Sequence, residues 1–160
     1  MNDLVLVDTN LLLLYIVGLA NRTYIGAHKR PSGYNDTDFE LLVQAISIFS
    51  DIVLLPHVLA EVSNLARQTP NPMMRSRIHE KLRELVEAAA EIPIPSRDGV
   101  RREEFGEYGV TDAVIPQLCS LNQSEVSFWL LTADHGLAVQ AEILGYNVMN
   151  FTYLRQSLPS

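Results

Sequence analysis

Cysteine is almost absent from this chain of 160 residues. Its one cysteine, Cys119, lies in an apolar stretch and has no partner for a disulfide within the chain. A lone cysteine in such a setting is typical of a small core residue in a protein from a reducing compartment. The sequence therefore predicts a cytoplasmic location and no thiol chemistry.

A hydrophobic run long enough to cross a bilayer is also missing. The very apolar segment 11–20 has about half of the roughly 20 residues that a membrane-spanning helix needs. No basic leader precedes it, so we expect neither a signal peptide nor a membrane anchor.

Basic residues are outnumbered, with 12 Lys and Arg against 19 Asp and Glu and a net charge of −7. This balance weighs against generic nucleic-acid binding, which depends on neutralising phosphates with Lys and Arg. Four of the negative charges, however, belong to Asp8, Glu61, Asp112 and Asp134, whose contexts are unusual. If these four acids hold divalent cations, the acidic balance does not exclude an RNA substrate.

The order of the predicted elements indicates an α/β fold with a largely parallel sheet of about five strands. Continuously apolar runs predict buried strands, and segments of helical spacing alternate with them. The strands are expected at 4–7, 52–55, 91–94, 126–132 and 146–150. The helices are expected at 10–17, 38–50, 56–68, 73–90, 111–120 and 135–144. The length fits a single domain spanning 1–160, with a loop insertion at about 19–37.

The four acids stand where a parallel sheet gathers its ligands. Asp8, Asp112 and Asp134 occupy predicted strand-to-helix junctions, and Glu61 lies on an apolar helical segment. The carboxyl ends of parallel strands share one edge, so distant segments should converge there. Gathering carboxylates in apolar surroundings is costly unless a cation compensates.

Each of these acids also has an ordinary explanation. Asp is common at helix N-termini, and Asp134 suits that role, as does Thr111 beside Asp112. Glu61 is either a surface residue or a ligand that points back at the cluster. Four polar residues adjoin the acids and would orient carboxylates or metal-bound water. They are Thr9, Asn10, Thr111 and Thr132.

Order and spacing together resemble the PIN-domain nuclease pattern. The matching segments run from about residue 3 to residue 153: Asp8-Thr9-Asn10 after an apolar strand, Glu61 in the next helix, Thr111-Asp112-Ala113, and Leu131-Thr132-Ala133-Asp134 with a trailing helix and strand. The resemblance implies a three-layer α/β/α sandwich and a Mg²⁺- or Mn²⁺-dependent ribonuclease site. The implied metal ligands and catalytic residues are Asp8, Glu61, Asp112 and Asp134.

Small single-domain members of that family resemble the toxins of VapBC toxin–antitoxin pairs. This likeness implies an RNA substrate, a cognate antitoxin protein and a homodimer. In the insertion, Arg22, Lys29 and Arg30 are candidates for RNA phosphate contacts. Tyr24 and Tyr34, in the same segment, either stack on bases or pack onto the domain.

Two other functions are open. One is a catalytically inactive PIN-like module that binds RNA or protein. The other is a phosphatase of the haloacid-dehalogenase type, which also begins with an Asp after its first strand. Such a phosphatase normally has a second Asp where Asn10 stands and a late lysine, whereas the lysines here are Lys29 and Lys81.

Overall fold

A parallel five-stranded sheet forms the centre of the molecule in the computed structural model, which describes residues 2–27, 33–102, 105–121 and 125–159. The strand order is β3-β2-β1-β4-β5, and every neighbouring pair is parallel. The strands are β1 (Asn2–Val7), β2 (Asp51–Leu54), β3 (Ala90–Glu91), β4 (Val126–Thr132) and β5 (Asn147–Asn150). The predicted α/β class with a parallel sheet is confirmed.

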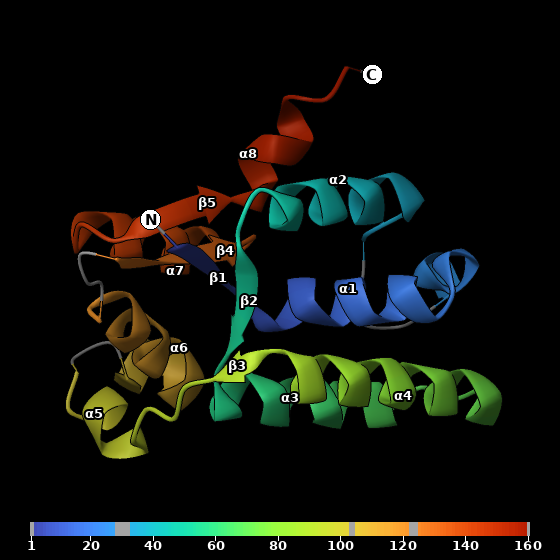
Figure 1. Cartoon of the computed structure of the whole chain (residues 1–160), viewed down its shortest axis with the longest axis horizontal. Helices are drawn as coiled ribbons and strands as arrows, with labels where there is room; N and C mark the ends of the chain where they lie inside the picture. The colour runs from blue at the N-terminus through green and yellow to red at the C-terminus, as the bar shows by residue number, and fades with distance from the viewer. Residues whose placement is uncertain (1, 28–32, 103–104, 122–124, 160) are drawn as a thin grey trace.

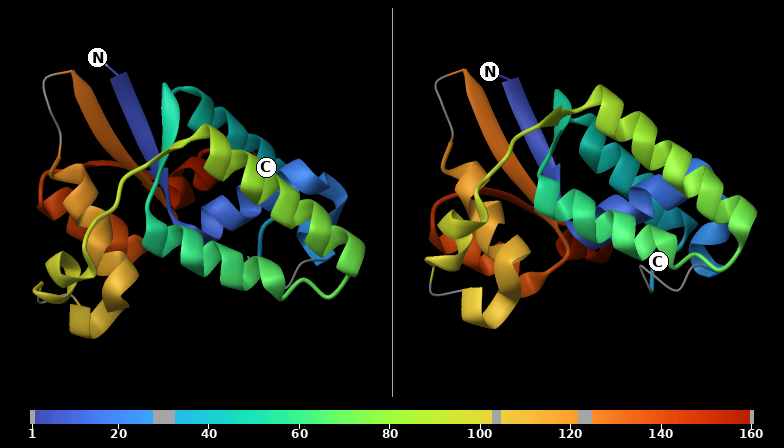
Figure 2. Two further views of the ribbon diagram at one scale, coloured as in Figure 1. Left: turned by 60° about the horizontal axis from the view of Figure 1, so that its bottom comes forward. Right: turned by 90° about the horizontal axis from the view of Figure 1, so that it is seen from below.

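Helices cover both faces of the sheet and complete three layers. They are α1 (Thr9–Ala20), the 3₁₀ helix η1 (Arg22–Ala27), α2 (Asp36–Ser47), α3 (Pro56–Arg67), α4 (Pro72–Ala88), α5 (Ser96–Val100), α6 (Phe105–Cys119), α7 (His135–Ile143) and α8 (Phe151–Gln156). In both views of Figure 2, α1–α4 lie on one side of the strands and α5–α7 on the other. Right-handed crossovers give this division, because the chain passes from β1 to β2 and β3 in one direction across the sheet and then from β3 to β4 and β5 in the other. In Figure 1, α8 lies beside α2.

The apolar segment 11–20 is a core helix. Most residues of α1 are buried, among them Leu11 to Leu14, because α1 contacts α2, α3 and α4. A helix that is hydrophobic all round requires such cover. No helix in the described part of the chain is long and apolar enough to cross a membrane.

Several predicted boundaries were wrong. The segment 19–37 is not one long loop, because α1 continues to Ala20, η1 follows, and α2 begins at Asp36. The third strand was expected at 91–94 but pairs with β2 only over Ala90–Glu91. The short helices α5 and α8 were not predicted.

Candidate functional site

The acidic residues gather at the carboxyl edge of the sheet, where β1 and β4 lie side by side. Asp8 directly follows β1, and its backbone N–H donates to the carbonyl oxygen of Leu131 in β4 at 3.0 Å. Asp134 follows the end of β4 by two residues. The connections from β1 and β4 run to opposite faces here, so this is the switch point at which open parallel sheets bind ligands.

Two hydrogen bonds fix the carboxylate of Asp8. The Thr9 backbone N–H donates to Oδ1 at 2.7 Å, and the hydroxyl of Thr132 donates to Oδ2 at 2.7 Å. The same hydroxyl oxygen accepts from the Asp134 backbone N–H at 3.0 Å, so the buried Thr132 joins two acidic segments. Burial raises the pKa of Asp8, and the charges of Asp134 and Glu61 raise it further, while the two hydrogen bonds oppose the shift.

Glu61 reaches the cluster from α3, which packs on α1. The hydroxyl of Thr9 donates to its Oε2 at 2.9 Å. Thr9 thus binds Asp8 through its backbone and Glu61 through its side chain. Although Glu61 is exposed, it points toward the cluster, as the ligand alternative required.

Asp112 enters from α6 just after a break in the helix. Gly109 has φ 86° and ψ 175°, a conformation that favours glycine, and the helix restarts behind it. Thr111 was predicted to be an N-cap, and this was wrong. It lies buried within the first turn of the helix after the break. Its expected role in orienting Asp112 stays a prediction.

The half-buried Asp112 shows how strongly the acids interact. Burial raises the pKa of Asp112 to about 7, with further contributions from the negative charges of Asp8, Asp134 and Glu61. This carboxyl therefore titrates near neutral pH in the metal-free protein. A nearby cation would favour its ionised form.

Asp134 caps a helix, as predicted, and also lies at the acidic edge of the sheet. Its Oδ1 accepts the backbone N–H of Leu137 at 2.9 Å, which makes it the N-cap of α7. The side chain is nevertheless exposed and lies in the wall of the cavity at Asp8. Capping holds one oxygen in place at the site.

The carboxylates are close enough to repel one another, but their oxygen atoms are not close enough together to bind one metal ion. Among the described residues, no group of three or more His, Cys, Asp or Glu side chains is arranged to hold a metal ion. Charges interact over roughly 10 Å, whereas Mg²⁺ and Ca²⁺ bind oxygen at about 2.0–2.6 Å. The donor chemistry of four carboxylates suits a hard divalent cation, and the side chains would have to move closer to bind one.

A cavity of about 170 Å³ opens beside Asp8. Asn10 and Tyr34 line it together with Asp134. Asn10 is exposed and lines this cavity, and its expected role in orienting a carboxylate stays a prediction.

Tyr108 is a neighbour of the site that the sequence did not single out. Its hydrogen bond to Glu107 is the largest cause of a raised pKa, and the charges of Asp134 and Asp112 add to it. A Cβ built on Gly136 would lie 3.4 Å from Asp134 Oδ1 and 3.7 Å from the Tyr108 hydroxyl oxygen, which places both side chains around this glycine. The only sign of an irregular turn near Tyr108 in the sequence is Gly109, which directly follows it.

The expected RNA contacts in the insertion have different outcomes. Arg22 is tied within the chain, since its Nε donates to Asp36 at 2.6 Å and Nη2 pairs with Glu40. Lys29 and Arg30 lie outside the described residues.

No protein-family model matches the chain, and no curated protein matches it.

The raised pKa of Asp112 predicts how stability changes with pH in the metal-free protein. A folded pKa of about 7, above the unfolded value of about 3.9, means that the folded form holds its proton more tightly. The free energy of unfolding should therefore fall as pH rises from about 4 to 7. Asp112→Asn should flatten this fall and raise Tm near pH 7.5 by about 2–4 °C, after allowance for solvent screening. Thermal melts in chelator across this range measure the effect.

Glu142→Gln is the matched control, since Glu142 is an exposed acid on α7. It should keep the wild-type pH dependence. Equal slopes for wild type and Asp112→Asn would contradict the assignment.

Proposed function

We propose that this protein is a metal-dependent endoribonuclease of the PIN type, which hydrolyses phosphodiester bonds in RNA. The observation that carries the proposal is the convergence of Asp8, Glu61, Asp112 and Asp134 at the switch point of the sheet, where Thr9 and Thr132 link three of the four acidic segments by hydrogen bonds. Four segments of the chain bring their carboxylates to one place at an electrostatic cost. A cation-dependent reaction explains why that cost is tolerated.

Mg²⁺ or Mn²⁺ fits the donor set, since both favour carboxylate and water oxygens. Asp8, Glu61 and Asp112 would hold the ion, and Asp134 would act directly or through water. When bound, the ion lowers the pKa of a water and neutralises charge on the phosphate.

The chain's own groups prepare this chemistry by holding the acids in place. Thr132 and Thr9 keep both oxygens of Asp8 oriented, and Thr9 also holds Glu61. The N-cap bond fixes Asp134. No protein nucleophile is needed, because water can attack the phosphorus. Oriented carboxylates lose less entropy on binding a cation and substrate.

Toxin activity with a cognate antitoxin, and assembly as a homodimer, belong to the same proposal and rest on the resemblance alone. The phosphatase alternative remains weaker, because Asn10 occupies the cavity wall where a second Asp is required. An inactive module would keep four repelling acids without use.

The test is cleavage of a labelled single-stranded RNA by the purified protein. We expect cleavage with Mg²⁺ or Mn²⁺, loss of the activity to background with EDTA, and recovery when Mn²⁺ is restored. An aryl phosphate serves as the comparison substrate and should not be hydrolysed. Hydrolysis of the aryl phosphate without RNA cleavage would favour the phosphatase. Calorimetry that shows no Mn²⁺ binding would favour the inactive module.

A further inference from the structure

Tyr34 forms a wall of the cavity at Asp8, although it precedes α2 and lies far from the acids in the sequence. The cavity that it lines with Asp8, Asn10 and Asp134 has a volume of about 170 Å³. Its ring is half-buried and lies 6.3 Å from that of Phe151, at 58° between the ring planes. Phe151 is buried at the start of α8 and packs against the ring in this tilted contact.

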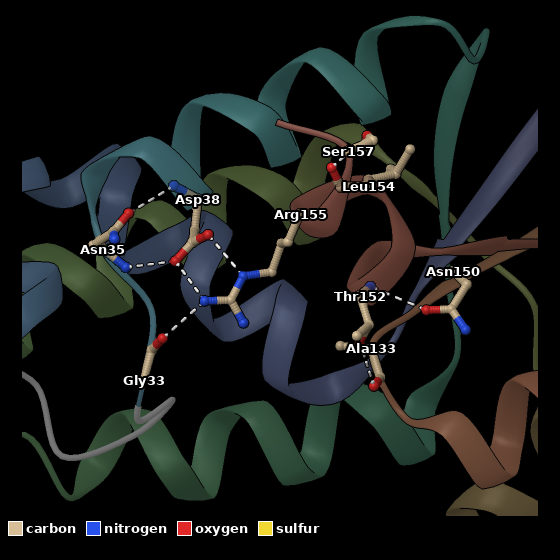
Figure 3. A network of polar contacts seen from close by, with 9 residues as sticks. All are labelled: Gly33, Asn35, Asp38, Ala133, Asn150, Thr152, Leu154, Arg155 and Ser157. Atoms are coloured by element: carbon tan, nitrogen blue, oxygen red, sulfur yellow. Dashed lines mark hydrogen bonds and ion pairs between the residues drawn. The ribbon is translucent and has the colours of Figure 1, made fainter. Parts of the chain in front are cut away.

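Arg155 on α8 holds this tyrosine in place. Its guanidinium carbon lies 4.9 Å from the centre of the Tyr34 ring. Nε donates to Asp38 Oδ1 at 2.8 Å and Nη2 donates to Asp38 Oδ2 at 3.1 Å, which makes a two-pronged ion pair. Nη2 also donates to the carbonyl oxygen of Gly33 at 3.1 Å (Figure 3). Gly33 directly precedes Tyr34 in the chain. The arginine therefore fixes the backbone before Tyr34 and one face of its ring.

The partner of Arg155 is itself rigid. Asp38 has a side chain that is only 7% exposed, and it forms a reciprocal capping box with Asn35 at the start of α2. Its carboxylate neutralises much of the arginine charge, so Arg155 is less suited to bind a phosphate directly. Its strongest effect on the site is through the position of Tyr34.

The helix that carries Arg155 is also attached to the edge of the site. The hydroxyl of Thr152 donates to the carbonyl oxygen of Ala133 at 3.2 Å, one residue before Asp134. The Thr152 backbone N–H donates to the Asn150 side chain at 3.0 Å (Figure 3). One short helix thus contacts both the acidic loop and the segment that presents Tyr34.

The size of the cavity indicates what can lie against Tyr34. A volume of about 170 Å³ equals roughly five or six water molecules at about 30 Å³ each, enough for a phosphate group but not for a nucleotide. The base attached to a phosphate bound there must lie on the rim. An aromatic ring beside a guanidinium is a stacking surface for an unpaired base.

We propose that Tyr34 is a substrate-contacting residue that stacks against the base of the nucleotide next to the cleaved phosphate, and that Arg155 is the positioning residue that holds its ring. This inference rests on the proposed ribonuclease function. It explains why a tyrosine and an arginine 121 positions apart in the sequence are joined at the acidic edge.

The first test changes the ring. Tyr34→Leu should raise KM for single-stranded RNA about 10-fold with little change in kcat, within the range measured for one aromatic–base stack. Tyr34→Phe and Tyr34→His keep a flat ring and should stay within about 2-fold of wild type. The matched control is Tyr153→Leu, which changes an exposed tyrosine on α8. Circular dichroism confirms that each variant is folded.

Binding is measured separately by fluorescence anisotropy of a labelled single-stranded RNA, with Asp112→Asn as a non-cleaving background. Adding Tyr34→Leu should raise Kd about 10-fold, and adding Tyr34→Phe should not. If wild type cleaves RNA but Tyr34→Leu leaves both KM and Kd unchanged, the role of Tyr34 is overturned while the ribonuclease stands. If wild type cleaves no RNA under any metal, the ribonuclease proposal fails and this inference fails with it.

A double-mutant cycle tests Arg155. Arg155→Gln should raise Kd about 5-fold to 10-fold in the presence of Tyr34, because the ring loses its support. In the Tyr34→Leu background the same change should have an effect of less than about 2-fold. Equal effects in both backgrounds would show that Arg155 does not act through Tyr34 and would overturn its positioning role.

Discussion

Replacing Asp8 or Asp112 with asparagine should lower RNA cleavage by at least about 1000-fold, which corresponds to about 4 kcal/mol of lost transition-state stabilisation. Asparagine has nearly the same shape but removes the negative charge that would bind the cation. Rates of cleavage of a labelled single-stranded RNA with Mn²⁺ measure the loss.

The fold should survive both changes. Burial already raises the pKa of Asp8 and Asp112, so a neutral side chain is tolerated at either position in the metal-free protein. The matched control is Asp51→Asn, since Asp51 begins β2 and lies at the opposite, amino edge of the sheet. It should retain wild-type activity. Undiminished metal-dependent cleavage by purified Asp8→Asn or Asp112→Asn would refute the proposed function.

Gly18→Ala should destabilise the protein by about 1–3 kcal/mol, although alanine is the better helix former by about 1 kcal/mol. Gly18 is buried in α1, directly against Phe39 of α2. A Cβ built there would lie 2.1 Å from Phe39 Cδ2 and 2.6 Å from its Cγ, so the ring and its attachment would have to move. Tm should fall by about 2–4 °C for each kcal/mol in a protein of this size.

Gly106→Ala provides the matched control for this substitution. Gly106 is exposed in the first turn of α6, and a Cβ there would have no atom within 4 Å. This variant should be as stable as wild type or slightly more stable. If thermal melts show Gly18→Ala to be the more stable of the two, the close approach of α1 and α2 is wrong.

Close packing has opposite effects on the stability of the protein at Gly18 and at Asp8. At Gly18, close packing contributes to stability because the apolar surfaces of α1 and α2 fit together. At Asp8, close packing opposes stability because it surrounds a carboxylate with little water and brings other acids near. Such a cost at one edge of a sheet, where the rest of the core is apolar, is typical of a functional site.

The strands that pass through the core were the most predictable part of the fold. The strand at 126–132 has the predicted limits, β2 is shifted by one residue, and β5 starts one residue later than predicted. Continuous apolar runs mark these strands because a parallel sheet is covered on both faces. The edge strand β3 is shorter than predicted, because pairing with β2, and not apolarity, sets its limits.

The acidic cluster was predictable for a related reason. Strand ends and helix starts can be located from local sequence, and parallel topology then brings Asp8 and Asp134 to the same edge. The junction predicted at Asp112 was wrong, because no strand precedes this residue, which lies in α6 after the kink at Gly109. The helical periodicity around Glu61 did not show whether its side chain points to solvent or toward the other acids. Only the packing of α3 on α1, with the Thr9 hydroxyl between them, resolved it.

The sequence by itself determined the class of fold, the edge at which the acids gather and the types of side chain at that edge, because each depends on local patterns of apolar and polar residues. The tertiary structure alone decided that Thr132 joins Asp8 to Asp134, that Asp112 follows a kink at Gly109, and that Arg155 holds Tyr34 against the cavity. These contacts join residues up to 124 positions apart. No local pattern encodes such a pair, because its geometry depends on how whole helices and strands pack.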